Sequence, residues 1–467
     1  MRRTVVVVSA LTSLVTGGGA LAQTPVAVVG GTLIDGRGGE PLPDAVVVIT
    51  ADRITAVGPA ATTPVPAGAH VIRADGKTVL PGLIDAHVHI GGSGGGSAVP
   101  EEFTPQAAAN NFKSYLMFGV TTVFDMAGNP FLEAQKAALA SGQLLGPRLF
   151  GVKYGITAPD AHPMLLLREY GIHEMLGPVY PQVDTVDAAR AAVRRVAADR
   201  TDGLKLFHSR AEFPGTSRYD ADKDKLSPDV LRALVEEAKA HGLRVFVHAS
   251  FPSEAREAVL AGVDTLAHSI STAETGTEEI FALMAERRVS YIPTLATIEA
   301  YYSLKVDPFW LERPAVTARV WEPIRRSITM PKSVVRARMT IPGLAEDARR
   351  SLEICLANLR RAVRAGVPIV MGTDSGNAGT LHGATVLREL ALMHEGGMTP
   401  MDVLVAATRN AAKAIGQSER LGTVETGKLA DLIVVGGDPL RDLARMADLE
   451  LVVKNGVPID PRGIRFE

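Results

Sequence analysis

The sequence predicts an α/β protein in which a (β/α)8 TIM barrel carries a small β-sandwich domain built from both the N-terminal and the C-terminal segments. Short apolar runs alternate with helical patterns through the middle of the chain, which is typical of parallel βα units. Strand-type runs broken by glycine, proline and aspartate occur before and after this region. The 467 residues leave room for a barrel and a second module.

Residues 1–22 are predicted to be an export signal. A charged start is followed by an apolar run over residues 4–15 and by small residues ending at Ala22, the order typical of a secretory signal peptide. The run is shorter than the roughly 20 residues that a membrane span requires. We therefore expect an exported protein, periplasmic or secreted, without a membrane anchor in its mature form.

The small domain is expected to use both ends of the chain. Residues 23–80 contain strand-type runs at 26–29, 45–49 and 54–57, and residues 421–467 contain similar runs at 429–435 and 449–456. The two segments are predicted to form two parts of one β-sandwich.

Residues 81–420 are expected to form the barrel. Its predicted strands are 83–89, 120–125, 148–152, 204–207, 245–248, 265–268, 291–294 and 369–374. Near the end of this region Thr399 can cap a helix that starts at Pro400 and stops before Gly416.

Two stretches interrupt this pattern and are expected to lie over the barrel mouth. The first is residues 91–97, which are mostly glycine. The second is residues 298–344, which form either a lid or an ordinary helical insertion.

The charge balance limits the classes of partner. The chain has 49 Lys and Arg against 51 Asp and Glu, so it has no basic surplus with which to neutralise phosphates or anionic lipid. We expect a small-molecule substrate and no nucleic-acid partner, and leave homo-oligomer formation open.

A metal site is indicated first by His87 and His89. Side chains two residues apart in a strand point to the same face, so both imidazoles can reach one ion. His248, His268, Asp374 and Lys205 also fall at or near predicted strand ends, and the carboxyl ends of barrel strands converge on one face. Each residue alone is more often structural, but their joint placement favours a shared metal site.

Four motifs carry a family resemblance. They are Pro-Gly-Leu-Ile-Asp-Ala-His-Val-His at 81–89, Gly-Val-Thr-Thr-Val-Phe-Asp at 119–125, Gly-Thr-Asp-Ser-Gly at 372–376 and Gly-Lys-Leu-Ala-Asp-Leu at 427–432. The chain from about residue 30 to residue 458 resembles the amidohydrolase superfamily, in particular its imidazolonepropionase-like and prolidase-like (Xaa-Pro dipeptidase-type) members.

This resemblance implies two divalent metal ions. His87, His89 and Asp374 would bind the inner ion, and His248 and His268 the outer one. Lys205 would be carboxylated and bridge both, because a carbamate offers anionic oxygens whereas an ammonium has no lone pair. Zinc is favoured, although manganese, cobalt and iron also suit these ligands. Asp374 would in addition act as the general base and then as the general acid.

The function expected from the resemblance is hydrolysis, by metal-activated water, of an amide bond in a small dipeptide or N-acyl amino acid. Two alternatives stay open: hydrolysis of a cyclic amide, lactone or phosphotriester at the same site, and a metal-binding barrel without catalysis. An open two-metal site argues against the last of these.

The substrate-binding residues are harder to predict. After Lys205 the chain reads Phe207-His208-Ser209-Arg210, where prolidase-like relatives typically have a Ser-Gly-Gly loop. Arg210, His162 and Tyr219 lie in loops after the third and fourth strands and are candidates for binding a substrate carboxylate, Arg210 above all. His382 is expected at the pocket border. A solvent-facing loop position is the alternative for the first three.

Overall fold

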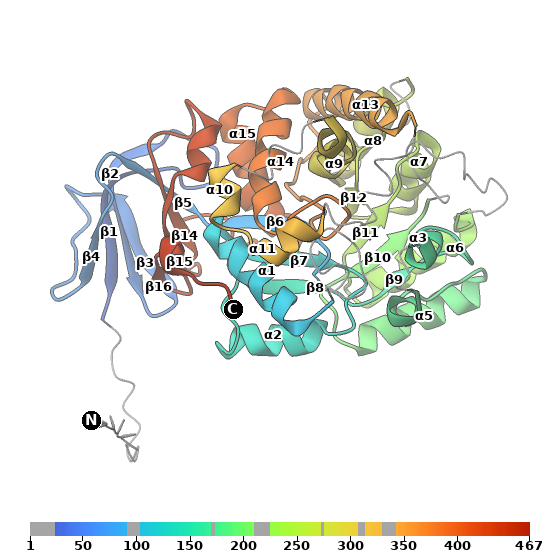
Figure 1. Cartoon of the computed structure of the whole chain (residues 1–467), viewed down its shortest axis with the longest axis horizontal. Coiled ribbons are helices and arrows are strands. Elements are labelled where there is room, and N and C mark those ends of the chain that lie inside the picture. Colours follow the sequence, from blue (N-terminus) through green and yellow to red (C-terminus); the bar gives the residue numbers. More distant parts are fainter. Residues whose placement is uncertain are drawn as a thin grey trace, which may run out of the picture.

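The computed structural model describes residues 24–90, 103–169, 173–209, 225–271, 275–306, 313–328 and 342–467. A β-sheet formed from both ends of the chain lies beside a larger body in which helices surround parallel strands (Figure 1). The α/β class is confirmed. The predicted export signal and the glycine-rich stretch 91–97 lie outside the described residues. No helix in the described ranges has both the length and the apolar character to cross a bilayer.

The smaller region is one eight-stranded sheet in the order β16-β15-β14-β5-β1-β2-β3, with β4 paired to β1. Its strands are β1 (Val26–Leu33), β2 (Leu42–Thr50), β3 (Arg53–Pro59), β4 (His70–Arg73), β5 (Lys77–Pro81), β14 (Leu432–Gly436), β15 (Leu449–Lys454) and β16 (Val457–Ile459). The two ends of the chain meet where β5 pairs antiparallel with β14, with Thr78 opposite Val435.

The larger region contains two parallel sheets. The first has the order β6-β7-β8 and the second β13-β12-β11-β10-β9. Their strands are β6 (Leu83–Val88), β7 (Val120–Met126), β8 (Arg148–Val152), β9 (Gly155–Ile156), β10 (Leu204–Phe207), β11 (Val245–His248), β12 (Thr265–Ala267) and β13 (Ser290–Ile292). Because β9 follows β8 almost at once, this stretch pairs with β7 on one side and with β10 on the other.

The last predicted barrel strand, 369–374, is not a continuous strand, yet its backbone links the two parallel sheets. The N–H of Val370 donates to the carbonyl of Tyr291, and the N–H of Ala86 donates to that of Met371, at 2.9 and 3.1 Å. At the end of this segment Asp374 takes a φ of 57°, outside the extended region. Residues 368–375 therefore lie between β13 and β6 and bring Asp374 beside the end of β6.

Helices cover the parallel strands on the outside (Figure 1). They are α1 (Pro105–Met117), α2 (Leu132–Ala140), α3 (Met164–Glu169), α4 (His173–Leu176), α5 (Val186–Ala198), α6 (Pro228–Ala240), α7 (Pro252–Ala261), α8 (Glu278–Arg287), α9 (Leu295–Val306), α10 (Pro314–Thr317), α11 (Glu322–Ser327), α13 (Leu344–Arg364), α14 (Ala384–Glu395), α15 (Pro400–Val405) and α16 (Ala411–Ala414), with short helical turns at Gly177–Val179, Ala406–Asn410, Leu443–Ala447 and Pro461–Gly463. The predicted cap is confirmed, since the Thr399 side chain accepts from the N–H of Asp402. Helices α9, α10 and α11 lie largely within stretch 298–344, whose role as a lid or an insertion stays a prediction.

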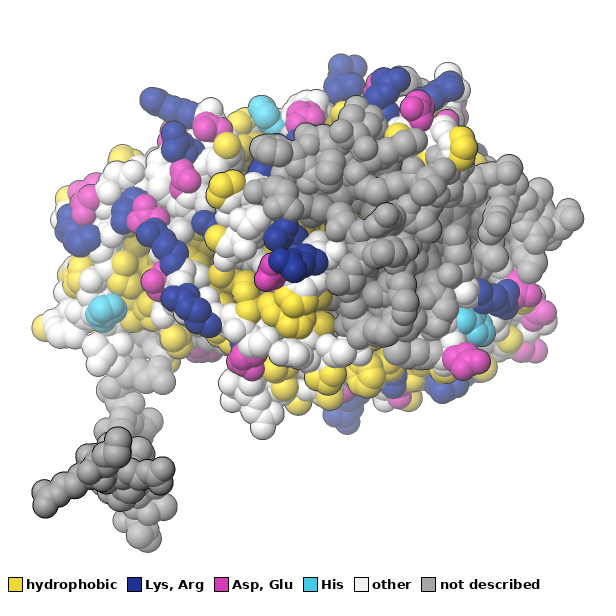
Figure 2. Space-filling view, in the orientation of Figure 1, with side chains coloured by type: hydrophobic (Ala, Val, Ile, Leu, Met, Phe, Trp, Pro, Cys, Tyr) yellow, Lys and Arg dark blue, Asp and Glu magenta, His cyan; other side chains and the backbone are white. Residues whose placement is uncertain are grey.

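Hydrophobic side chains reach the surface around α1 and α2, as Figure 2 shows. A cavity of about 300 Å³ lies there, with walls from both helices and from Ile90, Phe103 and Leu144. None of the predicted metal ligands lines it. This cavity is therefore separate from the predicted metal ligands.

A buried carboxyl group holds the start of α9. Glu389 of α14 accepts hydrogen bonds from the N–H groups of Leu295 and Ala296 at 3.0 and 2.7 Å. Burial raises the pKa of this carboxyl to about 8, although the two N–H groups oppose the shift. Because this pKa exceeds that of the unfolded chain, the protonated carboxyl stabilises the fold in acid, and the contribution is lost as the pH rises through about 8.

We therefore expect the stability of the wild type relative to Glu389→Gln to fall by at least about 1 kcal/mol between about pH 5 and pH 8. Urea unfolding of both proteins across this range measures the difference. A difference that does not change with pH would contradict the raised pKa.

Candidate metal centre

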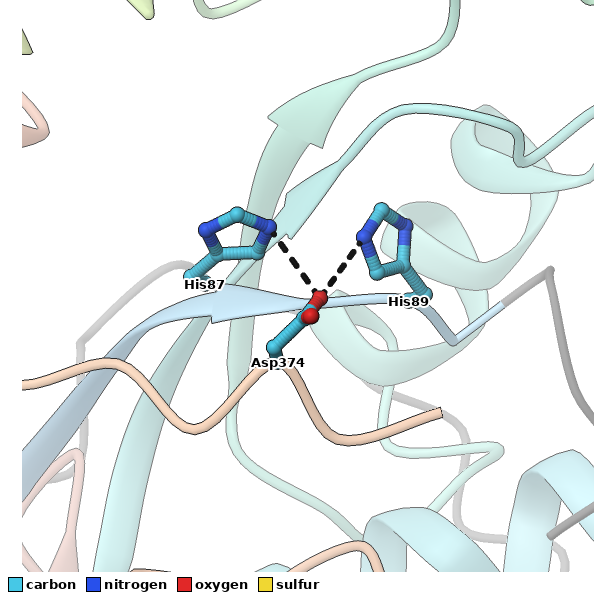
Figure 3. Close-up of side chains that lie close together, drawn as sticks. All are labelled: His87, His89 and Asp374. Carbon is cyan, nitrogen blue, oxygen red and sulfur yellow. Dashed lines mark ion pairs between the residues drawn. The ribbon is translucent and has the colours of Figure 1, made fainter. Parts of the chain in front are cut away.

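Three predicted ligands converge at the end of β6. The Nε2 atoms of His87 and His89 lie 3.3 and 3.1 Å from the same oxygen, Oδ1 of Asp374 (Figure 3). Ligand atoms of the three residues all lie within 4.8 Å of one another. His87 is fully buried, and Asp374 is nearly so. One ion can therefore be reached by all three side chains.

Two further histidines extend this group. The ring of His268 lies 4.6 Å from that of His87 and 4.3 Å from that of His248, measured between ring centres. The Nδ1 atom of His268 is 3.7 Å from Oδ2 of Asp374. The structure thus brings together four histidines from β6, β11 and the end of β12, with Asp374 facing three of them.

Lys205 is buried beside this group. Its Nζ lies 5.1 Å from the centre of the Phe207 ring, which is 5.8 Å from the ring of His248. Burial lowers the pKa of the ammonium to about 7, against the opposing effect of Asp374. Nζ has no hydrogen-bond partner within the described part of the chain. An amine in this environment is readily neutral, the form that carboxylation requires.

The donor set fits divalent cations. Burial, together with neighbouring positive groups, holds the pKa values of His87, His248 and His268 well below their usual range, so these rings are neutral and carry lone pairs. Nδ1 of His87 and Nζ of Lys205 lack partners among the described residues. A buried polar group in that state costs about 1–3 kcal/mol. Imidazole and carboxylate ligands suit zinc and related metals.

Neighbouring groups orient the ligands. Asp85 accepts hydrogen bonds from the backbone N–H and the hydroxyl of Thr373 at 2.9 and 2.6 Å, which fixes the segment of Asp374 against β6. The second ring nitrogen of His89 lies 3.1 Å from the carbonyl of Ala127. Contacts of this kind set the tautomer and the direction of metal-binding rings.

Backbone strain gathers at the same place. His268 and Asp374 adopt φ angles of 72° and 57°, and Ala127 and Thr294, which contact His89 and His268, adopt 98° and 47°. Non-glycine residues rarely occupy this region, and such strain is typical of functional sites.

The predicted substrate-binding residues are placed differently. The ring of His162 stacks on that of His248 at 4.4 Å, which puts it beside the outer ligands. His382 is buried, with Nδ1 2.9 Å from the Tyr115 hydroxyl. Arg210 and Tyr219 lie outside the described residues.

Sequence reasoning missed two features of the site. Nε2 of His208 lies 2.8 Å from Oε2 of Glu257, and the Ser209 hydroxyl donates to Glu254 at 3.0 Å. These contacts join the loop after β10 to α7, and no sequence motif marks them. Tyr180 packs against Phe207, with ring centres 5.7 Å apart, and no motif marks it.

The chain is similar to several known proteins. The model of the "Amidohydrolase family" matches residues 78–459. Ochratoxinase from Aspergillus niger is 26% identical over 443 residues, covering 89% of this chain and 82% of the relative. Imidazolonepropionase from Geobacillus kaustophilus is 25% identical over 402 residues, covering 79% and 77%. A crystal structure of a Xaa-Pro dipeptidase with bound methionine in the active site superimposes with a TM-score of 0.73 at 25% identity, covering 94% of this chain and 100% of that one.

Proposed function

Because this chain belongs to the amidohydrolase family and is similar to hydrolases that include a Xaa-Pro dipeptidase, we propose that it is a binuclear metal-dependent enzyme that hydrolyses an amide bond of a small dipeptide or N-acyl amino acid. The family resemblance seen in the motifs is confirmed. The observation that carries the proposal is the convergence of His87, His89 and His268 on the carboxylate of Asp374.

The proposal includes the closed architecture. We propose that β6 to β13 and residues 368–375 close into a (β/α)8 TIM barrel, and that the sheet from both chain ends belongs to a β-sandwich domain. The double pairing of the β8–β9 stretch and the hydrogen bonds of residues 368–375 to β13 and β6 support closure.

The metal roles follow the ligand chemistry. His87, His89 and Asp374 would hold one ion, His248 and His268 the other, and carboxylated Lys205 would bridge them, with zinc favoured. Such ions, when bound, polarise a carbonyl group and make water nucleophilic at neutral pH. The buried Nζ of Lys205, without a partner among the described residues, supports its modification.

The chain's own residues supply proton transfer and orientation. Asp374 would take a proton from the attacking water at a carboxylate oxygen and then pass it to the leaving amine. Its position is fixed through Thr373 by the buried Asp85. His162, whose ring stacks on that of the outer ligand His248, and His382, Arg210 and Tyr219 are the proposed substrate-binding residues.

The substrate class draws on the similar proteins. A Xaa-Pro dipeptidase, by its name, cleaves dipeptides, and its structure spans nearly the whole of this chain. Export remains part of the proposal on the strength of residues 1–22, and would place this chemistry in the periplasm or outside the cell.

A substrate screen tests the function. We expect the metal-loaded enzyme to hydrolyse dipeptides or N-acyl amino acids with a kcat/KM at least about tenfold above that for lactones and phosphotriesters. Dialysis against a chelator should abolish activity, and added Zn²⁺ should restore it. Preferred lactone or phosphotriester hydrolysis would favour the alternative activity; purified protein without divalent ions and without turnover would contradict the proposal.

A further inference from the structure

Tyr180 forms part of the wall beside the metal-binding residues. It follows the short helical turn Gly177–Val179, and its ring lies against Phe207 of β10. The side chain is almost wholly buried, with an exposed fraction of 7%. Phe207 in turn contacts the rings of His162 and His248, at 5.5 and 5.8 Å. Tyr180 therefore belongs to the same aromatic cluster as the outer metal ligand.

Two glycines make room for the phenol. A Cβ on Gly155 would lie 3.0 Å from a ring carbon of Tyr180, and a Cβ on Gly128 would lie 2.2 Å from its hydroxyl oxygen. Gly128 directly follows Ala127, whose carbonyl contacts Nδ1 of His89 at 3.1 Å. The ring of Tyr180 thus lies in the aromatic cluster that contains the outer ligand His248. Its hydroxyl lies beside Gly128, next to the residue whose carbonyl contacts the inner ligand His89.

The hydroxyl of Tyr180 makes no hydrogen bond to any residue in the described part of the chain, and its oxygen is not fully enclosed by those residues. Other buried tyrosines here do have partners: the Tyr154 hydroxyl donates to Asp199 at 2.6 Å, and that of Tyr115 lies 2.9 Å from His382. The hydroxyl of a largely buried tyrosine usually finds a hydrogen-bond partner. A ligand in the site would provide that partner.

The electrostatic surroundings keep this hydroxyl a donor. Burial, followed by the carboxylates of Asp125 and Asp374, raises the pKa of Tyr180 above its usual value. At neutral pH the phenol therefore retains its proton and can donate a hydrogen bond.

We propose that the Tyr180 hydroxyl donates a hydrogen bond to the carbonyl oxygen of the amide that is cleaved, which makes Tyr180 a catalytic residue for the hydrolysis; this inference rests on the proposed function. Negative charge grows on that oxygen as water attacks the carbonyl carbon. A fixed hydrogen-bond donor in a site with little water stabilises this negative charge more than it stabilises the uncharged carbonyl group of the bound substrate. The contribution should therefore appear in kcat rather than in KM.

Tyr180→Phe tests the proposal because it removes only the hydroxyl. We expect kcat for the best amide substrate to fall at least about tenfold, with KM changed less than about threefold. Metal content and the thermal midpoint should match the wild type. Tyr154→Phe, which also loses one buried hydroxyl but beside Asp199, should retain wild-type kinetics.

A second pair of variants leaves the hydroxyl in the protein but displaces it. Gly128→Ala would place a methyl group at the Tyr180 oxygen, whereas Gly142→Ala would meet no atom within 4 Å. The two glycines have nearly equal φ angles of 82° and 78°, so the backbone strain of the substitutions is matched. We expect Gly128→Ala to lower kcat as Tyr180→Phe does, with metal content retained, and Gly142→Ala to leave kcat unchanged.

Calorimetric binding of a phosphonamidate analogue of the amide, a tetrahedral mimic of the attacked carbonyl, gives a readout independent of turnover. The metal-loaded Tyr180→Phe protein should bind it at least about tenfold more weakly than the wild type. If Tyr180→Phe has the wild-type kcat and the wild-type affinity for the analogue, the role of Tyr180 is overturned while the proposed function stays intact. A rise in KM without a change in kcat would have the same meaning. A wild type that cleaves no amide contradicts the proposed function instead, and equal analogue affinities would then overturn the role of Tyr180 as well.

Discussion

Lys205→Ala is expected to lower kcat/KM by about 1,000-fold or more and to remove one of the two metal ions. Lys205 is fully buried, and its Nζ has no hydrogen-bond partner within the described residues, so the amine is available for carboxylation beside His248. An alanine offers no ligand atom. The outer ion would then depend on two imidazoles alone, which is fewer than the three protein ligands usual for a catalytic zinc.

Metal analysis by mass spectrometry and steady-state kinetics on the same preparation measure this effect. Lys113→Ala provides the matched control, since Lys113 is also mostly buried but pairs with Glu467 at 2.7 Å on the outer helix α1. We expect that variant to keep both ions and its activity. Two ions per chain and full activity in Lys205→Ala would remove the bridging lysine from the proposal.

Asp374→Asn is expected to retain bound metal and to lower kcat by about 1,000-fold or more. The amide has nearly the shape of the carboxylate, so contacts with His87 and His89 can persist through its oxygen. It cannot accept a proton at neutral pH, and proton transfer from water to the leaving amine is lost. KM should change little, because binding of the substrate before water attacks does not depend on this transfer.

Stopped assays over long incubations and metal analysis test Asp374→Asn. Asp199→Asn makes the same change at the partner of Tyr154, away from the metal ligands, and should leave kcat unaltered. An Asp374→Asn enzyme with wild-type kcat would show that another group moves the proton. A loss of metal with the loss of activity would instead make Asp374 chiefly a ligand.

The regular parts of the structure could be predicted because they follow simple periodicities. His87 lies near the end of β6 and His89 directly follows the strand, and the two-residue repeat of extended backbone is enough to place both rings on one face. His248 and His268 end or follow predicted strands that the structure contains as β11 and β12. Parallel pairing of these strands brings the residues together, so their placement can be predicted without knowing the conformations of the loops.

The irregular parts could not be predicted from the sequence. Asp374 faces the histidines from a turn-like segment with a φ of 57°, a conformation that the expected strand over residues 369–374 does not include. Tyr180 reaches the site only because glycines at positions 128 and 155 leave space for its ring. Such contacts join segments whose relative placement depends on the whole fold.

The pairing of β5 with β14 has a consequence for how the chain folds. Residues from opposite ends must meet before the eight-stranded sheet is complete, so the edge of β5 stays open until nearly all of the chain has left the ribosome. Contacts between residues so distant along the chain form slowly. The sheet is therefore a late step of folding, and a chain that ends before β14 would expose an unpaired edge to intermolecular association.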